Sequence, residues 1–224
     1  MTSVVAVSNT SNGSMYNRHD MLDPAIIANR QAFLQRHDIQ MNQATRLEIR
    51  FDSTDFCRYK EINETTKGVG MRDDTSIIAD ALITTHVDHA LFLPLADCVG
   101  AAIFDPEHAV LAMVHLGRHS LEQNGAHKII SHLVANYGSD PAQLRVHLTP
   151  AAGKSEYAIW ALNNKGMKEA TREQLASGGV RDENIIDTTI ETTSSSDYYS
   201  YSEFLKGNRT EDGDHAIVAM MTNN

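Results

Sequence analysis

Two apolar runs separated by a short polar turn constrain the fold of this chain most strongly. Residues 99–104 (VGAAIF) and 109–114 (AVLAMV) flank Asp105-Pro106-Glu107-His108, whose composition is typical of a tight turn. Both runs are apolar at consecutive positions, which indicates strands that are covered on both faces. If they pair around the turn, the residues that flank them, Cys98 and His115, meet at one end of the hairpin. The sequence therefore predicts a thiol and an imidazole at one site.

The remaining elements interleave helices and strands without strict βαβ alternation. Residues 46–51 (RLEIRF) alternate apolar and charged side chains, which predicts a half-buried strand. Asp23-Pro24 supplies an N-cap and a first-turn proline for a helix that ends near residue 36. Further strands are expected at 3–7, 79–84, 90–95, 144–149, 184–188 and 215–221, and further helices at 120–136 and 164–176. This order favours an α+β fold, with residues 1–224 forming one layered domain of mixed sheets flanked by helices.

Composition limits the possible partners. The formal net charge of −10 argues against a nucleic-acid or anionic-membrane surface, and leaves a small-molecule substrate as the expected partner. Cys57 and Cys98 are too few for a disulfide framework, and no signal-peptide pattern or membrane-length apolar run is found. We therefore expect a cytoplasmic protein. The sequence leaves its oligomeric state open.

The hairpin and its flanks resemble the laccase-domain family, also called multicopper polyphenol oxidase-like or peptidoglycan-editing-factor proteins. The resemblance extends along nearly the whole chain in the same order, from the helix after Asp23-Pro24 to the segment at 199–201. The residues that carry it most clearly are Asp80-Ala81-Leu82-Ile83-Thr84, Ala96-Asp97-Cys98, Asp105-Pro106, His115-Leu116-Gly117 and Leu148-Thr149-Pro150-Ala151-Ala152-Gly153. It implies the laccase-domain fold and an enzyme acting on purine nucleosides.

The resemblance also implies a zinc site, from which this chain departs. The family binds one zinc through a His, a Cys and a second His, and the last two correspond to Cys98 and His115. The first histidine is replaced, with Asp52 at the expected position in Arg50-Phe51-Asp52-Ser53. Asp, Cys and His can all ligate zinc, but an Asp and a Cys together cancel the charge of the metal and leave its bound water less acidic. The family tryptophan that follows the second histidine is also absent.

Three models of the site remain open. In the first, Asp52, Cys98 and His115 bind zinc and form the catalytic centre, or His119 supplies the missing ligand nitrogen. In the second, no metal is bound, and Asp52 orients His115, which activates Cys98 as a nucleophile. In the third, the site has lost catalysis. The chain has no H-x-H pair, so a multicopper centre is not expected.

Other residues are weaker candidates. By resemblance, Arg30 stands where the family arginine binds phosphate, and Arg118 and His119 follow as substrate-binding residues. His86 and His89 form an H-x-x-H pair in a predicted loop, where we expect surface exposure.

The leading functional interpretation is a purine nucleoside phosphorylase-like enzyme that cleaves adenosine or inosine with phosphate, with adenosine deamination as an additional reaction. One alternative is a metal-free Cys-His hydrolase acting on cell-wall precursors or amides. The other is a catalytically degenerate protein that binds a metabolite or a metal.

Overall fold

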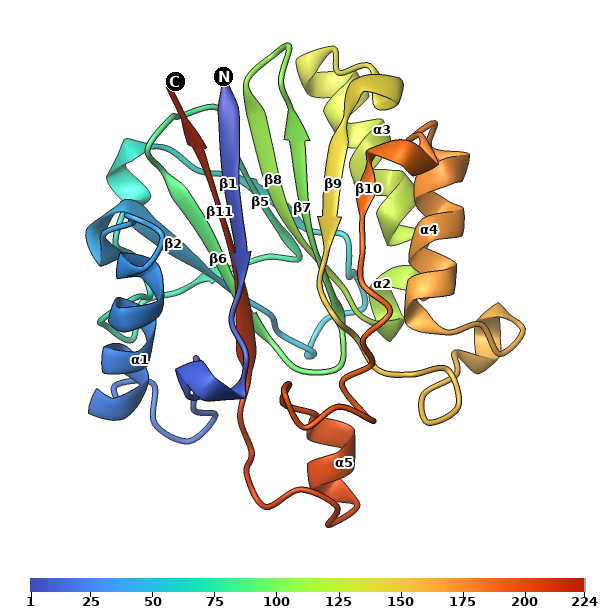
Figure 1. Ribbon diagram of the computed structural model, residues 1–224. Helices are drawn as coiled ribbons and strands as arrows, with labels where there is room; N and C mark the ends of the chain where they lie inside the picture. The colour runs from blue at the N-terminus through green and yellow to red at the C-terminus, as the bar shows by residue number, and fades with distance from the viewer. Residues whose placement is uncertain (224) are drawn as a thin grey trace.

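The computed structural model describes residues 1–223, which form two β-sheets packed face to face with helices on both outer sides (Figure 1). One sheet has five strands in the order β1-β11-β6-β2-β4, and the other has six in the order β10-β9-β7-β8-β5-β3. The first sheet is built from β1 (Thr2–Val7), β2 (Ala44–Glu48), β4 (Ile77–Ile78), β6 (Ala90–Leu95) and β11 (His215–Thr222). The second is built from β3 (Tyr59–Glu61), β5 (Ala81–Thr84), β7 (Val99–Asp105), β8 (Val110–Leu116), β9 (Arg145–Leu148) and β10 (Ile185–Ile186).

The helices form the two outer layers. The helix α1 (Pro24–Gln35) packs through Phe33 and Leu34 against the five-stranded sheet. Three helices cover the six-stranded sheet on the far side, where they share one hydrophobic cluster with its strands. They are α2 (Arg118–Glu122), α3 (Gly125–Tyr137) and α4 (Met167–Ser177). A short helix, α5 (Tyr201–Leu205), lies beyond the ends of the sheets (Figure 1). The expected α+β fold is confirmed.

The hairpin β7–β8 explains why its strands are apolar on both faces. Ala101 and Ile103 point into the cluster beneath the helices, whereas Ala102 and Phe104 point into the cluster between the two sheets. The strands pair antiparallel, with Val99 opposite Leu116. Alternate side chains of one strand therefore fill two different cores. Fully burying a side chain as large as Ile103 or Phe104 contributes about 1.5–3 kcal/mol.

Two predicted elements differ from the structure. The expected strand at 46–51 ends at Glu48, and every residue of β2 is buried, so the charged positions of its alternation do not face solvent. The expected helix at 120–136 is two helices, because Asn124 adopts a left-handed conformation with φ of 62°. Helical hydrogen bonding does not continue through such a residue. No helix within residues 1–223 is long and apolar enough to span a membrane.

Candidate functional site

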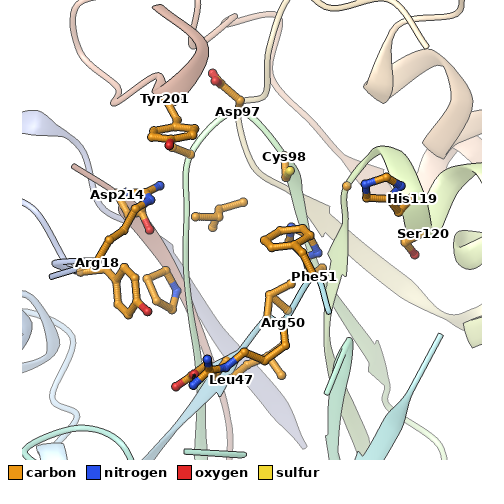
Figure 2. A pocket seen from close by; sticks show the side chains of 18 of the residues that line it. Arg18, Leu47, Arg50, Phe51, Asp97, Cys98, His119, Ser120, Tyr201 and Asp214 are labelled. Carbon is orange, nitrogen blue, oxygen red and sulfur yellow. Dashed lines mark hydrogen bonds and ion pairs between the residues drawn. The ribbon is translucent and has the colours of Figure 1, made fainter. Parts of the chain in front are cut away.

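A cavity of about 880 Å³ opens where the ends of the two sheets meet. Its wall combines the end of β6, the β6–β7 turn and the end of β8 with loops that are distant in the sequence (Figure 2). The N-terminal segment contributes Tyr16 and Arg18, the segment after β2 contributes Phe51, and the C-terminal region contributes Tyr201 and Asp214. The chain therefore encloses this space only when both of its terminal regions are folded.

The hairpin brings Cys98 and His115 to one point on this wall. A Cβ atom built on Gly117 would lie 3.0 Å from Cys98 Sγ and 2.8 Å from His115 Cε1. Only a glycine leaves room for both side chains there, although its φ of −86° is ordinary. The sequence pattern had predicted this proximity from the turn between the two strands.

Both groups are electrically neutral at pH 7 in this environment. Burial, and then the neighbouring Asp97, raise the pKa of the Cys98 thiol to about 12. Burial lowers the pKa of His115 to about 4, although Asp80 acts in the opposite direction. The imidazole makes no hydrogen bond to residues 1–223. An activated cysteine needs a nearby cation or a hydrogen-bonded base. The charge of Arg118 lowers the pKa of Cys98 but does not offset the effect of burial, so the neutral thiol does not support the hydrolase interpretation.

The expected third ligand does not join the pair. Asp52 is exposed, in an irregular segment after β2, although it lines the same cavity. The neighbouring Phe51 is the residue that faces His115, with their ring centroids 6.4 Å apart (Figure 2). The reason is that β2 ends early, so the pleat of a strand does not set which way residues 49–52 point.

The residues present do not fit a metal site. A zinc site uses at least three protein ligands at about 2.0–2.3 Å. Across residues 1–223, no three His, Cys, Asp or Glu side chains are grouped closely enough to share an ion. Cys98 and His115 supply two donors, and the ring of Phe51 offers none. The zinc ligation by Asp52, Cys98 and His115 that the resemblance suggested is therefore not formed by these side chains.

His119 does not supply the missing ligand either. Its ring stacks on Phe56, with centroids 4.7 Å apart, and its Nδ1 lies 3.7 Å from Glu122. Arg118 is exposed, lines the cavity and contacts His119 Nε2 at 3.3 Å. Within the described chain, Arg118 has no carboxylate within ion-pair distance, unlike the other arginines of the cavity. It is therefore available to a ligand.

Arg30 does not lie on the cavity wall. It is 1% exposed, and it donates hydrogen bonds to the backbone carbonyls of Met15, Gly70 and Met71. The H-x-x-H pair lies away from the cavity as well. His89 is buried and hydrogen-bonds to Thr45 Oγ1 at 2.7 Å, so the expected surface exposure is wrong for this residue.

Asp97 belongs to one of the motifs that carry the family resemblance, but the sequence assigned no role to it; in the structure its hydrogen bonds join three parts of the cavity wall. It adopts a left-handed conformation with φ of 68° in the turn before Cys98. Its carboxylate accepts hydrogen bonds from the Thr192 hydroxyl and the Ser202 amide, each at 2.7 Å, and its carbonyl accepts one from the Ala152 amide. A buried aspartate with partners in three separate segments, one of them the start of α5, fixes those segments relative to the hairpin. Aspartate adopts positive φ more readily than most residues. This preference was the available sequence signal for its place in the turn.

Structural comparison supports the fold. YfiH from Bacillus licheniformis matches with a TM-score of 0.83 and 17% identity, covering 98% of this chain and 93% of its own. YlmD from Geobacillus stearothermophilus gives a TM-score of 0.84 at 17% identity, with 99% and 92% covered. The protein NMB0706 from Neisseria meningitidis gives 0.68 at 15%, with 100% and 91% covered.

Sequence comparison gives the family. A comparison with curated proteins finds no related sequence. The family model described as multi-copper polyphenol oxidoreductase laccase matches residues 8–169, well over half of the chain, including the hairpin and both of its flanking residues. With the laccase-domain motifs in their expected order and the fold that they imply, this match makes the chain a member of the multi-copper polyphenol oxidoreductase laccase family.

Proposed function

We propose that this protein binds a purine nucleoside in the cavity without a bound metal, as a family member that has lost the metal-dependent reaction. The observation that carries the proposal is the position of Phe51. Its ring is 65% exposed and faces the Cys98–His115 pair, where a third metal donor would be needed. Phe51 offers no metal donor at this point and adds a flat apolar surface to the cavity.

The aromatic surroundings of Phe51 suit a planar base. The rings of Phe56 and His119 each lie 6.4 Å from Phe51 between centroids, and both line the cavity. A base stacked on an aromatic side chain gains about 1–3 kcal/mol. The cavity volume of about 880 Å³ is within the usual range for small-molecule sites.

Arg118 supports a preference among purines. Its planar guanidinium matches the O6 and N7 acceptors of a 6-oxopurine, whereas adenine presents an amino donor in place of O6. The unpaired Arg118 at the cavity therefore favours inosine or guanosine over adenosine. The purine class itself comes from the family resemblance, and the site residues add the stacking surface and the cation.

The test is calorimetric binding of inosine, adenosine and uridine to protein treated with a chelator. We expect inosine to bind best, and Phe51→Ala to weaken it about tenfold, while Phe51→Trp retains binding. Trp160→Ala is the matched control, because Trp160 is 83% exposed and lies outside the cavity. Equal affinity for inosine and uridine would overturn the proposal.

A second measurement addresses the reaction. Release of the free base from inosine is followed by chromatography in the presence of phosphate, with and without added zinc. We expect no release in either condition. Zinc-dependent release by the wild-type protein would show that the family reaction persists and would contradict the loss of the metal centre.

A further inference from the structure

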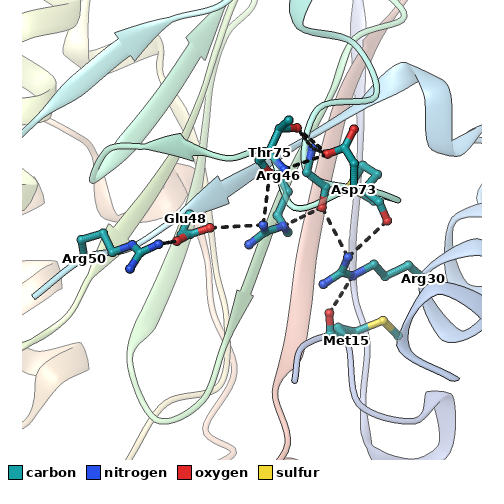
Figure 3. Close-up of polar contacts among 9 residues, drawn as sticks. Met15, Arg30, Arg46, Glu48, Arg50, Asp73 and Thr75 are labelled. Carbon is teal, nitrogen blue, oxygen red and sulfur yellow. Dashed lines mark hydrogen bonds and ion pairs between the residues drawn. The ribbon is translucent and has the colours of Figure 1, made fainter. Parts of the chain in front are cut away.

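An excess of buried positive charge lies beside the cavity. Arg30 and Arg46 are each 1% exposed, and both donate to the carbonyl oxygen of Gly70, from Arg30 Nη1 at 3.3 Å and Arg46 Nε at 2.6 Å (Figure 3). Two guanidinium groups that share one acceptor repel each other. Burial and then the charge of Arg46 lower the pKa of Arg30 to about 10, so Arg30 remains cationic at pH 7.

Within residues 1–223, Glu48 is the one carboxylate at ion-pair distance from either buried arginine. Glu48 accepts from Arg46 Nη2 at 3.2 Å and pairs with Arg50 Nη2 at 2.6 Å (Figure 3). Arg30 has no carboxylate within ion-pair distance in residues 1–223. Asp73 is close by, but it is exposed and accepts from the Gly70 amide and Thr75. Buried charges are ordinarily paired, because removing them from water is costly. Glu48 is shared between Arg46 and the exposed Arg50, and Arg30 has only backbone acceptors, so the two buried guanidinium groups leave positive charge uncompensated.

The two buried arginines also have unused donors. Arg30 Nη2 and Arg46 Nη1 are buried and make no hydrogen bond within the described chain. A buried donor without an acceptor costs about 1–3 kcal/mol, and more when it is charged. The unused donors and the excess charge together indicate an anionic acceptor that binds here.

The cavity gives access to Arg46. Arg46, its partner Glu48 and Tyr16 all line the cavity, whereas Arg30 does not. The ring of Tyr16 lies over the Arg46 guanidinium, 5.6 Å from Cζ to the ring centroid, and its hydroxyl makes no hydrogen bond within residues 1–223. A change of the Tyr16 rotamer, which occurs rapidly in partly exposed side chains, opens Arg46 Nη1 to a ligand.

We propose that Arg46, with Arg30 behind it, forms an anion subsite of the cavity that binds the phosphate group of a phosphorylated purine nucleoside. The planar fork of a guanidinium suits two phosphate oxygens. Arg46 and Phe51 are five residues apart, so at most about 17 Å of extended chain separates the phosphate subsite from the stacking surface. The inference rests on the proposed nucleoside site, and it makes the preferred ligand a nucleotide.

The test compares inosine 5′-monophosphate, inosine and inorganic phosphate by calorimetry. We expect the monophosphate to bind at least about tenfold more tightly than inosine, equivalent to about 1.4 kcal/mol. Arg46→Gln should remove this advantage, so that the monophosphate and inosine bind to the variant with equal affinity. Arg172→Gln is the control for loss of one positive charge, because Arg172 lies on α4 in ion pairs with Asp182 and Asp187, away from the cavity.

The outcomes separate the two proposals. Equal affinity of the wild-type protein for the monophosphate and inosine, or an advantage that survives in Arg46→Gln, would overturn the anion subsite while leaving nucleoside binding intact. Failure of inosine to bind, with Arg46-dependent binding of the monophosphate, would instead refute the neutral nucleoside as ligand. Tight binding of inorganic phosphate without preference for the monophosphate would exclude a nucleotide.

Arg46→Gln removes a buried group, so its folding is checked by circular dichroism and thermal unfolding. If it does not fold, two other measurements decide. Arg46→Lys keeps the charge but loses the fork, and should retain only part of the monophosphate advantage. Tyr16→Ala opens the subsite, and should strengthen monophosphate binding relative to inosine; an unchanged ratio in both variants would overturn the proposal.

Discussion

A single aromatic residue changes what the Cys98–His115 pair can do. The two donors meet as the hairpin sequence predicted, because Asp105-Pro106 sets the turn that places them at one end. The neighbouring Phe51 could not be predicted from the same reasoning. Its position depends on where β2 stops, and the alternation of residues 46–51 continues past that point. The hairpin pattern therefore accounts for the proximity of Cys98 and His115, whereas the position of Phe51 beside them depends on the end of β2.

Restoring a ligand tests this geometry directly. Phe51→His should place an imidazole beside His115 and Cys98 and create a zinc site, since three donors then converge. Asp52→His should gain little, because residue 52 is exposed and does not face the pair. Zinc content after dialysis against a metal buffer measures both. Higher occupancy in Asp52→His than in Phe51→His would show that residue 52 is the true ligand position.

At the level of elements, Asp97 accepts hydrogen bonds from three separate segments of the chain and so fixes them to the turn before Cys98. Asp97→Ala removes two hydrogen bonds to a charged acceptor and places alanine at φ of 68°, so we expect a loss of at least about 2 kcal/mol in unfolding free energy. Asp97→Asn keeps an acceptor oxygen and tolerates the conformation, and should lose less. Urea denaturation measures both variants. Equal losses would mean that neither the retained acceptor oxygen nor the tolerance of positive φ contributes, and that the lost charge accounts for the whole effect.

The elements themselves were largely predictable from the sequence, and the reason differs among them. The strands β6, β7 and β8 are apolar on both faces because each lies between two layers, and such runs are easily recognised. The predicted helix over 120–136 failed at Asn124, because the apolar periodicity of α3 gives no signal of a left-handed residue before it. Arg46 was expected on a solvated face, and its burial follows from packing that local periodicity does not report.

The whole molecule should lose stability in mild acid. Burial lowers the pKa of His89, His115 and His215 to about 4 each, whereas in the unfolded chain it is about 6.5. Between these values the unfolded state binds protons that the folded state does not, so the unfolding free energy falls as the pH decreases from about 6.5 to 4. Asp214 acts in the opposite direction, since burial raises its pKa to about 6 and the folded state then gains a proton first.

One histidine isolates this effect. His215 is fully buried, and neither ring nitrogen has a hydrogen-bond partner within residues 1–223. His215→Phe should flatten the pH dependence by about one proton, or about 1.4 kcal/mol per pH unit. Urea denaturation between pH 4.5 and 7 measures the slope, with His19→Gln as an exposed control. A slope identical to that of the wild type would contradict the buried neutral state of His215.

The position of β11 between β1 and β6 has a consequence for how the chain folds. Within residues 1–223, β1 has no partner other than β11, and residues 215–222 lie about 200 positions further along the chain. Residues 2–7 therefore stay an unpaired apolar segment until β11 has folded against β6, and the five-stranded sheet closes through this long-range contact. Such long-range pairing slows folding and exposes strand edges to aggregation. Without β11, β1 would have no partner and β6 would lose one of its two neighbours, so a variant truncated before residue 215 should expose two strand edges and aggregate more readily than residues 1–224.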